Sequence, residues 1–207
     1  MPQLLRALIW DMGGVLLRTE DQASRAQLAN QYGLSNAQLN YLVFGNPAAQ
    51  LCESGRMQPV ERWNFVARKL NLSDKELQAF QTLFWAGDRL DEELIRLIDS
   101  LRPRFKTGLL SNAGPDASAT LAAIYPRLLT PFDTIVFSGE VGLVKPDPAI
   151  YHLILNRMGV SPSQALFIDD FKQNIFTAQM VGLQTIWFRS ADQARRDLSS
   201  IIDEFSE

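Results

Sequence analysis

The chain has little of several residue types that would point to a function by composition alone. Cys52 is its only cysteine and His152 its only histidine. An intrachain disulfide and a zinc site built from cysteines are therefore excluded, and a reducing compartment is the simplest interpretation. We accordingly expect a cytoplasmic protein. His152 lies in a helical pattern beside apolar positions, which favours a surface or boundary position over a catalytic role.

An excess of one charge and a long apolar run are also lacking. The 20 basic and 23 acidic residues leave a formal net charge of -3, which is typical neither of a nucleic-acid binder nor of a polyacidic tail. Because no run of about 18 apolar residues occurs, no membrane-spanning helix is predicted. We therefore expect no nucleic-acid or membrane partner, and either a monomer or a homodimer.

Short apolar runs predict five strands, whose near-continuous apolarity indicates burial on both faces. They are Leu4 to Trp10, Thr107 to Leu110, Thr134 to Phe137, Ala165 to Ile168 and Gln184 to Phe188. Helical patterns separate most of them. The best-marked helix has Asp147 as its N-cap, Pro148 as its first residue and a stop at Gly159. Repetition of strand and helix predicts an α/β fold with a parallel sheet and helices on both sides.

Residues of roughly 18 to 88 contain several helix signals and no convincing strand, so a helical insert is predicted there. Ser35 with Gln38, and Ser73 with Glu76, fit capping boxes. Two apolar stripes favour burial of these helices against one another. The stripes are Trp63, Val66 and Leu70, and Leu77, Phe80 and Phe84.

Polar residues come directly after the apolar runs, where ligands bind in open parallel α/β sheets. They are Asp11, Ser111 with Asn112, Lys145 in GLVKPDP, and Asp169 with Asp170. If the strands are neighbours, these side chains converge on one edge of the sheet. Three carboxylates that lie close together cannot all stay ionised unless a cation neutralises them. Hard oxygen ligands on a partly open site favour Mg²⁺ together with a substrate phosphate.

Each of these features also has a plainer interpretation when it is taken alone. Ser111 with Asn112 fits a turn or a helix cap, and Lys145 fits a solvated loop lysine. The pair Asp169 and Asp170 fits a cap for the following helix. A coincidence of all these features at strand ends is much less favoured than a common site.

The segments DMGGVL, LLSN, GLVKPDP and FIDDFKQN resemble the four ordered motifs of the haloacid dehalogenase superfamily. The resemblance covers nearly the whole chain, and four motifs in order are far more specific than one. It implies a three-layer, Rossmann-like core of residues 1–17 and 89–207. The helical insert of residues 18–88 resembles the family's small all-helical cap domain, and the first motif, DxGGVL, resembles a phosphatase-like branch.

The resemblance implies a nucleophile and a metal site at the first and last motifs. Asp11 would attack a phosphoryl group, while its second oxygen, the Gly13 carbonyl and Asp170 would bind Mg²⁺. Asp169 would be an alternative or supporting carboxylate. This assignment agrees with the chemistry of phosphoryl transfer, which needs mainly positioning and neutralisation of charge.

The middle motifs would hold the phosphate. The resemblance implies that Ser111 and the backbone at Asn112 bind the phosphoryl oxygens, and that Lys145 bridges Asp11 and the phosphate. Asn174 would buttress the acidic loop. Together these roles imply an aspartyl-enzyme intermediate that water then hydrolyses.

One position departs from the family pattern. Phosphatases of the family usually have a second aspartate two residues after the nucleophile, where this chain has Gly13, which cannot transfer a proton. Losing that acid–base group costs about 3–5 kcal/mol of barrier, so a low activity is expected. Three compensations stay open: a carboxylate such as Glu20 or Asp21, a water, or a substrate with a good leaving group.

These considerations predict a Mg²⁺-dependent phosphatase acting on a small phosphorylated metabolite such as a sugar phosphate. One alternative is a 2-haloacid dehalogenase-type hydrolase, because such enzymes also lack the second aspartate and expel a halide without a proton. The pair Asp169 and Asp170 argues against it, since that chemistry needs no metal. The other alternative is a weakly active or non-catalytic binding protein of the same fold.

The substrate would be selected by cap side chains that the sequence does not single out. Tyr41, Phe44, Arg56 and Trp63 are candidates, and CESGRM fits either a cap turn near the site or a plain surface turn.

Overall fold

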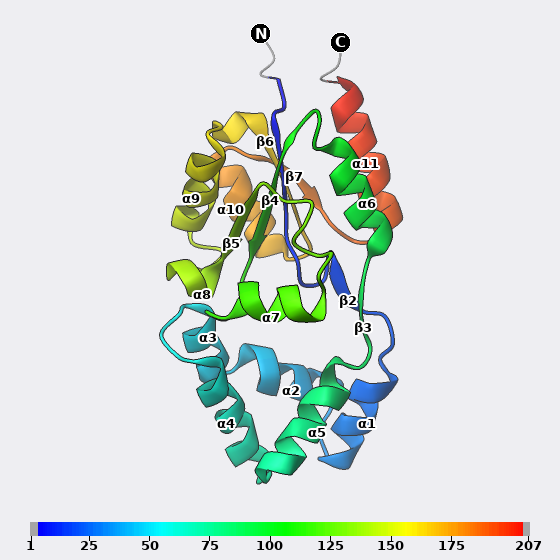
Figure 1. Cartoon of the computed structure of the whole chain (residues 1–207), viewed down its shortest axis with the longest axis vertical. Coiled ribbons are helices and arrows are strands. Elements are labelled where there is room, and N and C mark those ends of the chain that lie inside the picture. The colour runs from blue at the N-terminus through cyan, green and yellow to red at the C-terminus, as the bar shows by residue number, and fades with distance from the viewer. Residues whose placement is uncertain (1–3, 205–207) are drawn as a thin grey trace.

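The computed structural model describes residues 4–204 and has a five-stranded parallel sheet at its centre (Figure 1). The strand order is β5-β4-β1-β6-β7. These strands are β1 Ala7–Trp10, β4 Lys106–Ser111, β5 Thr134–Phe137, β6 Ala165–Asp169 and β7 Gln184–Trp187. The predicted parallel α/β fold is confirmed. The first predicted strand starts too early, because Leu4 is exposed and regular pairing begins at Ala7.

Two apolar clusters fill the space on either side of the sheet. Side chains of β1 alternate between them: Leu8 and Trp10 belong to one cluster, and Ala7 and Ile9 to the other. The first cluster is covered by α6 Glu92–Leu101 and α11 Ala191–Glu204, and also receives Ala117 from α7 Ala117–Ile124. The second is covered by α9 Pro148–Met158 and α10 Lys172–Val181. The sheet is thus buried on both faces, as its apolar strands predict.

The best-marked helix of the sequence forms as predicted. Asp147 is the N-cap of α9, where its carboxylate accepts a hydrogen bond from the backbone N–H of Ala149, and Gly159 ends the helix in a left-handed conformation. His152 is exposed, as expected. Two short helices lie in the loops on either side of α9, namely α8 Ser138–Val141 and η2 Pro162–Gln164.

Helices between β1 and α6 form a separate layer beyond the carboxyl edge of the sheet (Figure 1). They are α1 Ala23–Gln31, α2 Asn36–Asn40, the π-helix η1 Tyr41–Gly45, α3 Pro47–Glu53, α4 Pro59–Leu70 and α5 Asp74–Trp85. Both predicted capping boxes are present. Val66, Phe80 and Phe84 of the predicted stripes are buried in one cluster, and Trp63 and Leu70 pack against it while partly buried. No helix within residues 4–204 is long and apolar enough to cross a membrane.

A two-stranded antiparallel ribbon connects this layer to the sheet. It consists of β2 Leu17–Thr19 and β3 Asp88–Leu90. The expectation of no strand between residues 18 and 88 is therefore wrong at both margins, because strands of three residues are too short to produce a periodic signal. The ribbon runs across the predicted domain boundaries at residues 17/18 and 88/89, and the division into two domains stays a prediction.

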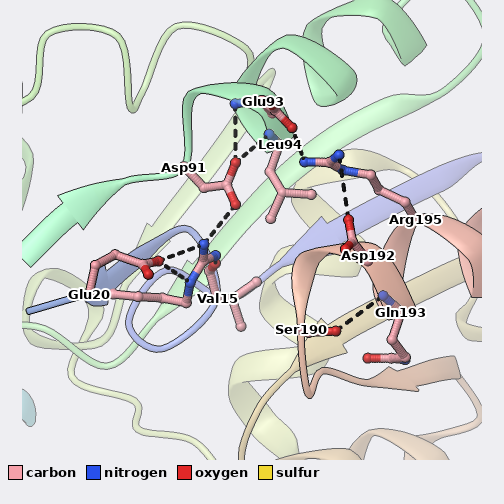
Figure 2. Close-up of polar contacts among 10 residues, drawn as sticks. Val15, Glu20, Asp91, Glu93, Leu94, Ser190, Asp192, Gln193 and Arg195 are labelled. Carbon is pink, nitrogen blue, oxygen red and sulfur yellow. Dashed lines mark hydrogen bonds and ion pairs between the residues drawn. The ribbon is translucent and has the colours of Figure 1, made fainter.

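Asp91 fixes the point at which the chain returns from the ribbon to the sheet (Figure 2). Its Oδ1 accepts hydrogen bonds from the backbone N–H groups of Glu93 and Leu94, at 3.1 and 2.9 Å, and so caps α6. Its Oδ2 accepts a hydrogen bond of 2.8 Å from Arg18 in β2. One carboxylate therefore joins the start of α6 to the outgoing strand of the ribbon.

A buried ion pair holds the helical layer to the ribbon. Arg25 in α1 donates from Nη2 to Asp88 Oδ1 at 2.9 Å, and their side chains are only 10% and 6% exposed. Asp88 Oδ1 also accepts a hydrogen bond of 2.6 Å from the Thr19 hydroxyl. The Arg25 guanidinium lies 4.3 Å from the centre of the Phe84 ring. Each charge is thus paired inside an apolar and aromatic setting.

We predict that Asp88→Ala lowers the free energy of unfolding by about 3 kcal/mol, because it leaves Arg25 buried without its carboxylate. Urea denaturation followed by circular dichroism measures this loss. Asp99→Ala is the matched control, because Asp99 is 66% exposed and lies 3.7 Å from Arg102; we expect it to cost less than about 1 kcal/mol. Equal losses in the two variants would contradict the role given to the buried pair.

Candidate active site

The polar residues singled out at strand ends lie together at the carboxyl edge of the sheet. β1 lies between β4 and β6, with both of which it pairs in parallel. Asp11 follows β1 directly, Ser111 ends β4, and Asp169 ends β6. Ser111 and Asp169 are both buried, at 2% and 0% exposure. The parallel register therefore places a hydroxyl and a carboxylate on either side of Asp11.

Lys145 reaches this edge from the loop between α8 and α9. Its Nζ donates to Asp11 Oδ1 and to Asp169 Oδ2, each at 2.7 Å. The three residues are at most 5% exposed. A single buried ammonium thus bridges carboxylates from two neighbouring strands that are 158 residues apart in sequence (169 minus 11).

Two asparagines hold this triad in place. The Asn112 side-chain amide donates to the carbonyl oxygen of Lys145 at 2.9 Å, and its Oδ1 accepts from the backbone N–H of Lys145 at 2.8 Å. Asn174 donates from Nδ2 to both oxygens of Asp169, at 3.1 and 2.9 Å. The backbone N–H of Phe171 adds a bond of 2.7 Å to Asp169 Oδ1. Both oxygens of Asp169 are therefore fully engaged within the protein.

The electrostatics of the triad follow from one ammonium facing two carboxylates. The pKa of Asp11 is raised from 3.8 to about 7, mainly by burial. The charge of Lys145 acts to lower this pKa, and the charge of Asp169 acts to raise it. The pKa of Lys145 lies above its usual value, although burial lowers it, because Asp11 and Asp169 favour the charged form. Lys145 therefore keeps its proton, while the negative charge of Asp11 is only partly compensated.

Asp170 has a carboxylate oxygen without a partner. Asp11, Asp169 and Asp170 each offer one oxygen such that all three lie within 4.8 Å of one another. Asp170 Oδ1 is buried and has no hydrogen-bond partner in the part of the chain that the structure describes. Burial, and then the Asp169 charge, raise the pKa of Asp170 to about 6. Carboxylates that are crowded and incompletely compensated in this way can hold a hard divalent cation.

The structure adds contacts that sequence reasoning missed. The Trp187 indole N–H donates to the carbonyl oxygen of Asp170 at 2.9 Å, and the Tyr151 hydroxyl donates to that of Asn174 at 3.1 Å. The side-chain role of Asn112 was missed as well. All of these hydrogen bonds join a side chain to the backbone of a distant segment, so no local sequence pattern predicts them.

The four aromatic and arginine candidates of the helical layer do not gather into one surface. Tyr41 and Arg56 are exposed. Phe44 and Trp63 pack against Trp85, with ring centres 5.7 and 6.3 Å apart. The CESGRM segment does approach the loops of the site, because Cys52 lies against Gly114 and Gly55 lies against Gly139. The sequence does not single out Glu53, which stands between them.

The site geometry agrees with what comparison of the sequence finds. A family model described as haloacid dehalogenase-like hydrolase matches residues 5–182. The chain belongs to this family.

Two curated relatives match almost the whole chain. The drimenol cyclase of Aspergillus calidoustus is 26% identical over 99% of this chain, but the match covers only 38% of the relative's own length. The D-ribitol-5-phosphate phosphatase of Bacteroides thetaiotaomicron is 25% identical over 97% of this chain and over its own entire length. The chain thus corresponds to part of one relative and to the whole of the other.

Solved structures of family members share the fold. A haloacid dehalogenase-like hydrolase from Porphyromonas gingivalis superposes with a TM-score of 0.77 at 24% identity, over 97% of this chain and 98% of the other. An enzyme of the family from Bacteroides thetaiotaomicron, solved with magnesium and inorganic phosphate, gives a TM-score of 0.73 at 22% identity, over 90% and 96%. The three-layer, Rossmann-like α/β architecture is therefore that of the family.

We predict that Asp11→Asn stabilises the protein in the presence of a chelator, more at pH 8 than at pH 5. Since the folded-state pKa of Asp11 is raised to about 7, stability is lost as the pH rises from about 4 through about 7. Asparagine does not ionise and avoids this loss. We expect a gain of at least about 1 kcal/mol at pH 8, or roughly 2–4 °C in melting temperature.

Thermal melts at both pH values, with EDTA present, measure the effect. Asp203→Asn is the matched control, because Asp203 is exposed on α11, and we expect no pH-dependent difference from it. An Asp11→Asn variant that melts below the unaltered protein at pH 8 would contradict the assigned electrostatics.

Proposed function

We propose that the chain is a Mg²⁺-dependent phosphatase that forms an aspartyl-enzyme intermediate on Asp11. The proposed substrate is a small phosphorylated metabolite such as a sugar phosphate, in the cytoplasm, with residues 18–88 as the cap domain over the site. The observation that carries the proposal is the buried Lys145, 2.7 Å from Asp11 Oδ1, beside a second and a third carboxylate. The similarity to the D-ribitol-5-phosphate phosphatase supports the substrate class.

The first half of the reaction needs a nucleophile and a clamp for the phosphoryl group. Asp11 attacks phosphorus, and Lys145 fixes the attacking carboxylate and neutralises the phosphoryl oxygens. The Ser111 hydroxyl and the backbone at Asn112 hold the remaining phosphoryl oxygens. The Asn112 side chain supports this arrangement indirectly, because it holds the backbone of Lys145 on both sides.

The residues present fit a magnesium ion. Asp11, the Gly13 carbonyl and Asp170 would hold it, and the buried, unpartnered Oδ1 of Asp170 is the observation that supports this set. Asp169 is assigned to positioning Lys145, because both of its oxygens already accept hydrogen bonds. When bound, magnesium supplies positive charge that offsets the charge of the phosphoryl group and of the carboxylates.

The acidic cluster and Lys145 favour phosphoryl transfer over dehalogenation and over binding without turnover. Dehalogenation of a 2-halo acid needs no metal, and the charge of Asp170 beside Asp169 would repel the carboxylate of such a substrate. A binding protein without turnover would not need the Lys145–Asp11 ion pair, whose burial costs desolvation energy. Phosphoryl transfer uses all of these groups.

We expect the protein to release phosphate from members of a sugar-phosphate panel when Mg²⁺ is present, and not after EDTA treatment. Asp11→Asn should lower kcat by at least about 10³-fold, because the nucleophile is lost. A malachite-green assay measures the release. Absence of phosphate release from the panel, or chloride release from 2-chloro acids in EDTA, would contradict the proposal.

The control for this experiment is Asp203→Asn, which removes one exposed carboxylate. Its phosphate release should match that of the unaltered protein. Melting curves establish that Asp11→Asn is folded, so that its loss of turnover reports on chemistry.

Gly14→Ala tests the proposed metal set. Gly14 has a φ of +79°, and a Cβ added there would lie 2.2 Å from Asp170 Oδ2. The methyl group must displace the Asp170 carboxylate, so we expect the Mg²⁺ concentration for half-maximal activity to rise by at least about 10-fold. Activity titrated with MgCl₂ measures this shift.

Gly33→Ala is the matched control for backbone strain. Gly33 has a φ of +64°, and a Cβ added there would meet nothing within 4 Å. We expect reduced stability in both variants, but an unchanged Mg²⁺ requirement in Gly33→Ala. Equal metal requirements in the two variants would count against Asp170 as a ligand.

A further inference from the structure

The proposed reaction needs a proton donor that the first motif does not supply. Gly13 stands two residues after Asp11, where family phosphatases usually have an aspartate. It is exposed, and a Cβ added there would meet nothing within 4 Å. Space for an acid is therefore present beside the nucleophile, and another part of the chain can provide the acid.

The end of α3 and the turn that follows it pack against segments next to the site. A Cβ added at Gly55 would lie 2.4 Å from the carbonyl oxygen of Gly139, and one added at Gly114 would lie 3.1 Å from Cys52 Sγ. Gly114 comes shortly after Asn112, and Gly139 lies in α8, which precedes the Lys145 loop. Residues 52–55 are thus packed against the segment that follows Asn112 and against α8, the helix before the Lys145 loop.

Glu53 directly precedes this turn, and the charges of two cations act on its carboxyl group. It is the last residue of α3 and is only partly exposed. Burial raises the pKa of Glu53, while the charges of Arg62 and Lys145 lower it. Lys145 is bonded to Asp11, so one of the charges that act on Glu53 belongs to the active site.

Arg62 is itself fixed in position. Its Nη2 donates to the carbonyl oxygen of Val43 at 2.9 Å, and its Nε is buried without a hydrogen-bond partner among the described residues. The charge of this anchored guanidinium favours the ionised form of Glu53 that remains after Glu53 gives up a proton.

Open space adjoins this turn. Ser54 and Arg56 line a cavity of about 540 Å³ together with Gly142, Leu143, Val144 and Asp147. The cavity separates the turn from the residues just before Lys145. Open space is thus available beside Ser54, the residue that follows Glu53.

The two acids weighed from sequence are held elsewhere. Glu20 forms an ion pair of 2.9 Å with Arg18, and Asp21 accepts a hydrogen bond of 2.8 Å from the backbone N–H of Ala23. Both are exposed at the ribbon. Neither acid belongs to residues 52–55, the segment that packs against α8 and the loop after Asn112.

We propose that Glu53 is the acid–base group of this active site, protonating the leaving oxygen of the substrate in place of the aspartate that Gly13 lacks. The inference rests on the proposed phosphatase function and deepens it. It makes Glu53 a further catalytic residue contributed by the helical layer.

The proton and bond balance closes over one turnover. As Asp11 bonds to phosphorus, the bond from phosphorus to the leaving oxygen breaks, and that oxygen takes the proton of the Glu53 carboxyl group to form an alcohol. Water then attacks the aspartyl phosphate, and the Glu53 carboxylate accepts a proton from this water. The products are an alcohol and inorganic phosphate, with Asp11 ionised and Glu53 protonated again.

Leaving-group dependence tests this role. p-Nitrophenyl phosphate expels a phenolate that needs little protonation, whereas an alkyl or sugar phosphate expels an alkoxide that needs a proton. We expect Glu53→Gln to lower kcat/KM, which reports the steps up to departure of the leaving group, by at least about 10²-fold for a sugar phosphate and much less for p-nitrophenyl phosphate. The comparison is made with Mg²⁺ present on the full chain.

A second acid should restore the loss. The double variant Gly13→Asp with Glu53→Gln returns a carboxyl group to the family's position, and we expect it to regain sugar-phosphate turnover over Glu53→Gln alone. Glu20→Gln is the matched control and should leave both substrates unaffected. The substitution at Glu53 changes only one oxygen to an amide nitrogen, and melting curves establish that the variant is folded.

The outcomes separate the two proposals. If Glu53→Gln lowers kcat/KM for both substrates equally, or for neither, Glu53 does not protonate the leaving oxygen, while the phosphatase function stands. If the unaltered protein hydrolyses neither substrate with Mg²⁺ present, the proposed function fails, and the role of Glu53 fails with it.

Discussion

The ammonium of Lys145, buried between Asp11 and Asp169, is the interaction on which the rest of the site depends. Burying charged groups costs several kcal/mol for each ion unless geometry and hydrogen bonds compensate. Here the two ion-pair bonds of 2.7 Å are supplemented by the donors that Asn174 and the Phe171 backbone offer to Asp169. The ends of β1 and β6 are thereby held to the loop that follows α8.

Adjacent aspartates have different surroundings because successive residues at a strand end point in different directions. Asp169 is fully buried and surrounded by donors, whereas Asp170 is partly exposed and keeps one oxygen without a partner. This difference supports the proposal that Asp169 positions Lys145 and that Asp170 holds the metal ion. The sequence pair alone leaves the two residues equivalent.

Much of the fold and part of the site could be predicted from the sequence. The limits of β5 and the capping of α9 by Asp147 match the prediction, because continuous apolar runs and cap residues are local signals. Asp11 and Asp169 could be found because polar residues at the ends of parallel strands must meet. The hydrogen bonds between Asn112 and Lys145, and the position of Glu53 beside the site loops, could not be predicted because they depend on contacts between distant segments. Strand β2 could not be predicted because three residues are too few to show a period.

The ribbon of β2 and β3 brings the outgoing and returning chains side by side before the helices begin. The sheet therefore constrains only the spacing and direction of two neighbouring strand ends. The length, order and surface of what lies between them are left free. Such an attachment permits a different helical segment to be exchanged into the same core during evolution. With the proposed function, substrate preference and phosphoryl chemistry could then change independently.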